Sequence, residues 1–127
     1  MATIGSVSLT IELGGGNTSE VTVEYPIRFS SLDVLGNLEY RERVRLRGAD
    51  SFPNGGDDEL TTLQNVRVRP NGQATLNRRI VRQVANSTLN EDSPFQDDEI
   101  YARVNLRDVD GLFQPVRRDS NEVSGSF

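Results

Sequence analysis

The ten residues LEYRERVRLR, at positions 38–47, carry the clearest structural signal in the chain. Apolar residues and arginines alternate through most of this stretch. Because side chains in a β-strand point alternately to the two faces of a sheet, a period of two predicts a strand with one buried face and one face in water. The apolar positions are Leu38, Tyr40, Val44 and Leu46, and they alternate with Glu39, Arg41, Arg43, Arg45 and Arg47.

The same alternation extends outward through most of the chain, and turn residues separate the runs. Asn71-Gly72, between two alternating runs, is the strongest hairpin signal. Pro26 interrupts a run and predicts an edge strand or a bulge there. The tail 116–127 adds an expected last strand around Val123 and Phe127. The other alternating runs lie at 7–13, 21–29, 66–69, 74–84 and 100–107, and the turns at 14–17, 53–56, 70–72 and 110–111.

These runs predict an all-β fold in which about seven to eight short strands form an antiparallel two-sheet β-sandwich, immunoglobulin-like in the broad sense. A small closed β-barrel is the alternative. No segment shows the apolar stripe of a helix, so we expect none. The length of 127 residues fits one domain, and we see no linker inside residues 1–127.

The composition removes much of the chemistry of enzymes. All fourteen basic residues are Arg, and His, Cys, Lys and Trp are absent. Without His, no side chain has an unperturbed pKa near neutrality, and without Cys there is no thiolate nucleophile, disulfide or Cys-based zinc site. Without Lys, no Schiff base can form. We therefore expect a protein that is not an enzyme and uses no cofactor.

Carboxylates gather in three of the expected connections. If successive strands reverse direction, the connections 14–20, 50–58 and 86–98 lie at one end of the sandwich. The connections 30–37, 70–72 and 108–111 then lie at the other end. The first end becomes an acidic tip that holds no Arg. It carries Glu20, Asp50, Asp57, Asp58, Glu91, Asp92, Asp97 and Asp98, with Glu59 and Glu99 just inside the strands.

One interpretation of the acidic tip is a calcium site, since Ca²⁺ takes six to eight oxygen ligands that loops can supply. The clustered carboxylates resemble the calcium loops of C2 domains, and the resemblance implies Ca²⁺ as a ligand. It covers only Asp50, Asp57, Asp58, Asp92, Asp97 and Asp98. The alternative is that these residues keep the tip solvated and cap local turns. A further run, 108–111, resembles the start of an EF-hand loop, but the rest of that loop is missing, so we interpret it as a plain turn.

The arginines sit mainly on strand faces, and we expect them to form an interaction surface. An acidic tip and an arginine-bearing face are complementary, and because they cannot meet within one sandwich they would meet between copies. We therefore predict a structural or assembly subunit, as a homo-oligomer or as part of a larger protein assembly. A calcium-dependent module for a carbohydrate or protein ligand is the alternative. The candidate interface residues are Arg41, Arg43, Arg45, Arg47, Arg67, Arg69 and Arg103.

Other partners are disfavoured. The net charge of -5 and the excess of nineteen carboxylates over fourteen arginines have the wrong sign for nucleic-acid binding. Residues 1–20 lack a basic segment followed by an apolar one, so we expect no signal peptide. No run is long enough to span a membrane, and we expect no membrane partner. The absence of Cys leaves the compartment undetermined between the cytoplasm and an assembled particle.

Overall fold

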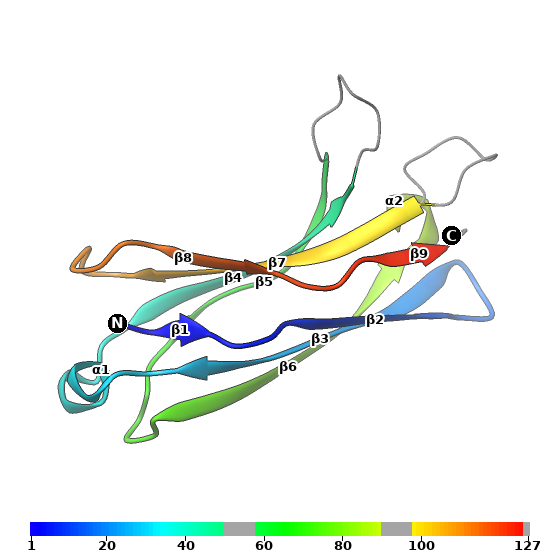
Figure 1. The fold of residues 1–127 in the computed structure, drawn as a ribbon. Helices are drawn as coiled ribbons and strands as arrows, with labels where there is room; N and C mark the ends of the chain where they lie inside the picture. Colours follow the sequence, from blue (N-terminus) through cyan, green and yellow to red (C-terminus); the bar gives the residue numbers. More distant parts are fainter. Residues whose placement is uncertain (50–57, 90–97, 126–127) are drawn as a thin grey trace.

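The computed structural model describes residues 1–49, 58–89 and 98–125, and in them two antiparallel sheets pack together (Figure 1). The predicted two-sheet sandwich is confirmed. The first sheet contains β1 (Thr3–Ile4), β2 (Ser8–Leu13), β3 (Thr18–Arg28) and β6 (Thr75–Ala85). The second contains β4 (Tyr40–Gly48), β5 (Asp58–Val68), β7 (Asp98–Asp108), β8 (Val116–Asp119) and β9 (Val123–Gly125). No helix in the described part of the chain is long and apolar enough to cross a membrane.

One strand organises each sheet. In the first sheet β3 pairs with β1 and β2 on one side and with β6 on the other. In the second sheet β4 lies between β5 and β7, and both β8 and β9 pair with β7. The inward residues of these strands form the core between the sheets. Its fully buried apolar side chains include Val21, Val23, Ile27, Val44, Leu46, Leu89, Ile100, Val104 and Leu106.

The turn at Asn71-Gly72 is present, but it does not close a hairpin. Both residues have positive φ values, 50° and 83°, as that dipeptide predicts. The strands that it joins lie in different sheets, because β5 pairs with β4 and β6 pairs with β3. The hairpin prediction is therefore wrong. Local turn chemistry determines the reversal of the chain, whereas the pairing of each strand depends on which sheet edge is open to it.

Pro26 lies in the central strand β3 and not at a sheet edge. Its carbonyl accepts a hydrogen bond from the Gly5 N–H at 2.9 Å, at the break between β1 and β2. In an antiparallel ladder the N–H and C=O of one residue face the same neighbour, so the missing N–H of Pro26 faces this irregularity. A Cβ on Gly5 would lie 2.4 Å from Pro26 Cγ, which is why the chain has glycine there.

Two short helices occupy connections that were expected to be loops. The first, α1 (Ser31–Gly36), begins with a capping box. In it the Ser30 hydroxyl accepts from the Asp33 N–H while the Asp33 carboxylate accepts from the Ser30 N–H. Asn37 ends the helix in the left-handed conformation, with φ of 44°. The second, α2 (Asn86–Leu89), is a single turn. Neither helix is long enough to show a repeated apolar stripe, so the periodicity could not reveal them.

Asp33 is completely buried at the N-terminus of α1. Its carboxylate accepts hydrogen bonds from the Tyr40 hydroxyl at 2.6 Å and the Ser30 N–H at 2.8 Å, and the Met1 amino group lies 3.2 Å away. Burial acts to raise the pKa of Asp33, but the hydrogen bonds from Tyr40 and Ser30 outweigh it and lower the pKa. Burial and the bond to Asp33 raise the pKa of Tyr40.

A second buried carboxylate joins the two sheets. Glu42 on β4 points into the core and is fully buried. It receives two hydrogen bonds of 2.8 Å from the guanidinium of Arg78 on β6 and one of 2.7 Å from the hydroxyl of Tyr25 on β3. The bonds to Glu42 raise the pKa of Arg78, while burial and then the charge of Glu42 raise the pKa of Tyr25. Glu42 thus accepts hydrogen bonds from side chains of two strands of the first sheet.

Removing one partner of the Glu42–Arg78 ion pair is expected to destabilise the fold strongly. Glu42→Leu leaves the half-buried guanidinium of Arg78 unpaired and is expected to lower the free energy of unfolding by about 3 kcal/mol. The double variant Glu42→Leu/Arg78→Leu is expected to recover much of this loss, because it removes both charges. Urea unfolding of the single and double variants measures the coupling. Additive losses would show that the two residues do not act as a pair.

Asp33 predicts a distinct dependence of stability on pH. Its folded pKa lies below the ordinary value of 3.8, so its stabilising effect is present above that pH and is lost as the pH falls through the folded pKa. Asp33→Asn is expected to lower stability at pH 7 by about 1–2 kcal/mol. The difference from the wild-type protein is expected to shrink below about pH 4. Unfolding curves from pH 7 to pH 2 test this, and a difference that is constant with pH would contradict it.

Candidate functional site

The outer face of the second sheet carries most of the arginines of the chain. Because the inward positions of β4 are Tyr40, Glu42, Val44 and Leu46, the four arginines between them point outward. Antiparallel pairing places further arginines of β5, β7 and β8 beside them on the same face. We call this surface the arginine face. It consists of Arg41, Arg43, Arg45, Arg47, Arg67, Arg103, Arg107 and Arg117.

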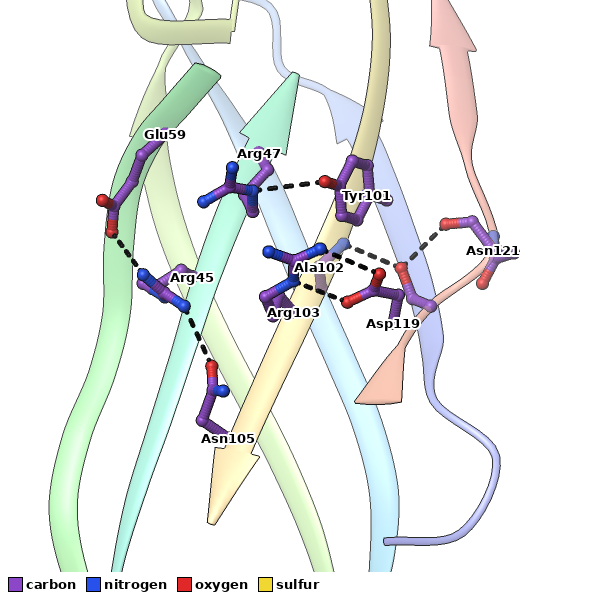
Figure 2. A network of polar contacts seen from close by, with 10 residues as sticks. Arg45, Arg47, Glu59, Tyr101, Ala102, Arg103, Asn105, Asp119 and Asn121 are labelled. Carbon is purple, nitrogen blue, oxygen red and sulfur yellow. Dashed lines mark hydrogen bonds and ion pairs between the residues drawn. The ribbon is translucent and has the colours of Figure 1, made fainter. Parts of the chain in front are cut away.

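Several arginines of the face make contacts with side chains of neighbouring strands (Figure 2). Arg103 makes a two-pronged contact with Asp119 at 2.9 and 3.2 Å, and its guanidinium lies 5.7 Å from the centre of the Tyr101 ring. The Tyr101 hydroxyl accepts from Arg47 at 3.2 Å. Arg45 donates to Asn105 at 3.0 Å. These three arginines hold neighbouring strands together, so their guanidinium groups are less free for a partner.

Other arginines are more exposed and pair with carboxylates near the surface. Arg43 lies 3.6 Å from Glu59. Arg67 and Arg69 share Glu39 at 3.5 and 3.0 Å, and Arg69 also donates to the Asn37 carbonyl at 2.9 Å. Exposed pairs of this kind contribute little to stability and are screened by salt. Their guanidinium groups can therefore exchange an internal partner for an external one.

Glu59 does not belong to a separate acidic region. It was expected just inside the strand at the acidic tip, away from arginine. It lies instead on the arginine face, 3.6 Å from Arg43 and 3.5 Å from Arg45. The reason is the register, which puts Glu59 opposite Arg47 on the neighbouring strand. Acidic and basic groups thus do meet within one molecule at this point.

The strand ends that flank the two acidic connections lie together, at the end of the sandwich away from α1 (Figure 1). Gly48, the last residue of β4, pairs with both Asp58 and Ile100, and the Ala49 N–H donates to the Glu99 carbonyl at 2.8 Å. The Asn86 N–H donates to the Asn17 carbonyl at 2.8 Å, which brings the β2–β3 connection to the same end. This agrees with the predicted sorting of the connections.

The predicted calcium ligands fall almost wholly outside the described residues. This holds for Asp50, Asp57, Asp92 and Asp97 and for the side chains of Asp58 and Asp98, which begin β5 and β7. Among residues 1–49, 58–89 and 98–125, no group of three or more acidic side chains is arranged to hold a metal ion. The calcium site stays a prediction.

The run Asp108-Val109-Asp110-Gly111 is a hydrogen-bonded turn. The Asp108 carboxylate is buried and accepts from the backbone N–H groups of Asp110 at 2.8 Å and Phe113 at 2.7 Å. Gly111 has a φ of 71°, which suits glycine. These bonds occupy both carboxylate oxygens of Asp108, in agreement with the interpretation of this run as a plain turn.

Two arginines of the face, Arg107 and Arg117, were absent from the predicted interface. Arg107 belongs to the same alternating run as Arg103, so its position could have been inferred from the sequence. Arg117 could not, because the four-residue strand β8 is too short for a clear alternation. The internal partners Asp119 and Asn105 also required the pairing of β7 to be known.

Replacing an arginine that has an ion-pair partner is expected to affect stability more than replacing an exposed arginine that has none. Arg103→Gln removes a two-pronged ion pair and is expected to lower the free energy of unfolding by about 1 kcal/mol. Arg41→Gln, which removes an exposed arginine between two others, is expected to change it by only a few tenths of a kcal/mol in either direction. Thermal and urea unfolding of both variants test this difference. Equal losses would contradict it.

In comparisons of this chain with protein-family models, with curated proteins and with solved structures, nothing matches.

Proposed function

We propose that this protein is a non-enzymatic structural subunit that self-associates, or joins a larger particle, through its arginine face. The observation that carries the proposal is the charge of this face on an acidic chain. The whole chain has a net charge of -5. In the described part of the chain, the arginines of this face nevertheless share their side of the sheet with only four carboxylates, Glu39, Glu59, Glu99 and Asp119.

Such a separation of charge favours contacts between unlike surfaces. Two arginine faces repel each other, so a symmetric contact between them is disfavoured. An arginine face and an acidic surface attract, and arginine forks bind carboxylates with defined geometry. A contact between different surfaces of identical copies is heterologous, and it produces rings or filaments. The charge layout therefore supports assembly of this kind.

The acidic connections 50–57 and 90–97 are the proposed counterpart of the arginine face. By sequence they carry Asp50, Asp57, Glu91, Asp92 and Asp97 and no arginine. The strands on either side of them end at one end of the sandwich. The face itself covers the side of the second sheet. The proposed contact is therefore between the end of one copy and the side of the next.

Association is expected to depend on protein concentration and to weaken with salt. Raising the ionic strength from 0.01 M to 1 M shortens the screening length from about 30 Å to about 3 Å. Size-exclusion chromatography with light scattering is expected to show oligomers at low salt that dissociate at high salt. A calcium arm and an EDTA arm show whether Ca²⁺ competes for the same carboxylates.

Two double variants show whether association depends on the arginine face or only on the net charge of the protein. Arg43→Gln/Arg67→Gln is expected to weaken association at low salt. The control Arg28→Gln/Arg79→Gln makes the same change of charge on the outer face of the first sheet and is expected to leave association unchanged. A wild-type protein that is monomeric under all conditions would rule out self-association, and equal effects of the two variants would rule out the arginine face as the contact.

A further inference from the structure

We propose that Arg41 and Arg107 form a binding site for an oxyanion, such as a phosphate group or a pair of carboxylates. Arg67 lies beside them on the arginine face. The site deepens the proposed function, because it identifies where an acidic group of a neighbouring copy would be held. A free inorganic anion offers the same chemistry, and it provides the means to test the site separately.

The first argument is the register of three adjacent strands. Arg41 on β4 is directly opposite Arg67 on β5 and directly opposite Arg107 on β7. Among the described residues this is the only row of the sheet with arginines on three neighbouring strands. Like charges directly opposite each other in an antiparallel sheet destabilise it. An anion between the guanidinium groups would remove this repulsion.

The next row of this face contains Arg43, which lies 3.6 Å from Glu59, and two further rows have internal partners for their arginines. Arg45 and Arg103 form their row with Asp119, and Glu59 and Asn105 are also bonded to Arg45. Arg47 lies opposite Tyr101, which accepts its hydrogen bond. Within the described part of the chain, neither Arg41 nor Arg107 lies within ion-pair distance of a carboxylate. Arg41 donates instead to the Asn65 amide oxygen, at 3.4 Å.

The carboxylates near these two arginines in the sequence are already in use, including Glu42 next to Arg41, which is bonded to Arg78. Glu39, two residues before Arg41, is bonded to Arg67 and Arg69. Asp108, next to Arg107, is buried and accepts from two backbone N–H groups. The positive charge of Arg41 and Arg107 is therefore not neutralised by the residues beside them. Because both arginines are exposed, an external anion can reach them.

The surface is hollowed at the same place. A pocket of about 340 Å³ is lined by Arg41, Arg107 and Val109. One water molecule takes up about 30 Å³ in the liquid, so the pocket has room for an oxyanion together with several waters. Two guanidinium groups on the wall of one pocket can each direct two parallel N–H donors at such a group. Geometry, charge and space thus point to the same ligand class.

Isothermal titration with inorganic phosphate, at constant ionic strength maintained with chloride, tests the site. The wild-type protein is expected to bind phosphate saturably at one site. Arg41→Gln and Arg107→Gln are each expected to weaken this binding about tenfold or more, because each removes a charge-assisted contact. The matched controls are Arg28→Gln and Arg79→Gln, on the outer face of the first sheet. Both are expected to keep the wild-type affinity.

Circular dichroism of the exposed variants Arg41→Gln and Arg107→Gln without phosphate verifies that they fold. An absence of saturable binding to the wild-type protein, or equal weakening in the controls, would overturn the site. The phosphate-binding test and the assembly test can succeed or fail independently. A monomer that binds phosphate at Arg41 and Arg107 supports the site and contradicts the assembly. An oligomer whose formation is insensitive to phosphate and to both substitutions retains the assembly and contradicts the site.

Discussion

The register of β4 is the constraint on which the other features depend. Every even position from Tyr40 to Leu46 points into the core, and every odd position from Arg41 to Arg47 points to water. A slip of one residue would turn four guanidinium groups into the sandwich, at a prohibitive cost in desolvation. Glu42 adds a second constraint on the register. Its carboxylate is satisfied only where Arg78 and Tyr25 of the other sheet can reach it.

The core and the arginine face are therefore linked through one strand. The same alternation that places Glu42 opposite Arg78 across the core places the arginines of β4 on the outer face. The strands β5 and β7 follow the register of β4 and add their own arginines in rows. In some rows the arginines contact Asp119, Glu59 or Tyr101, and these contacts connect neighbouring strands. Arg41 and Arg107 have no carboxylate partner among the described residues, and these two arginines are the proposed anion-binding part of the face.

The sequence predicted the sandwich because alternation is a property of each strand alone. It also predicted which arginines of β4 share a face. It did not reveal the role of Glu42, although a carboxylate at an inward position of an otherwise apolar series was a signal. Arg78 stands at the corresponding inward position of β6. Recognising the pair required knowing that β4 and β6 face each other across the core. For the same reason Asn71-Gly72 predicted a turn correctly and a hairpin wrongly, since pairing is decided by distant strands.

The central claim is that specific guanidinium groups of the arginine face contact an acidic partner, which in the simplest case is another copy of the chain. NMR spectra of the arginine Nε–H groups, recorded at low salt with increasing protein concentration, test it most directly. The account predicts that the signals of Arg41, Arg43, Arg67 and Arg107 shift with concentration and return at high salt, while the signal of Arg78 stays constant. Signals that do not move, or that shift equally on both outer faces, would contradict it.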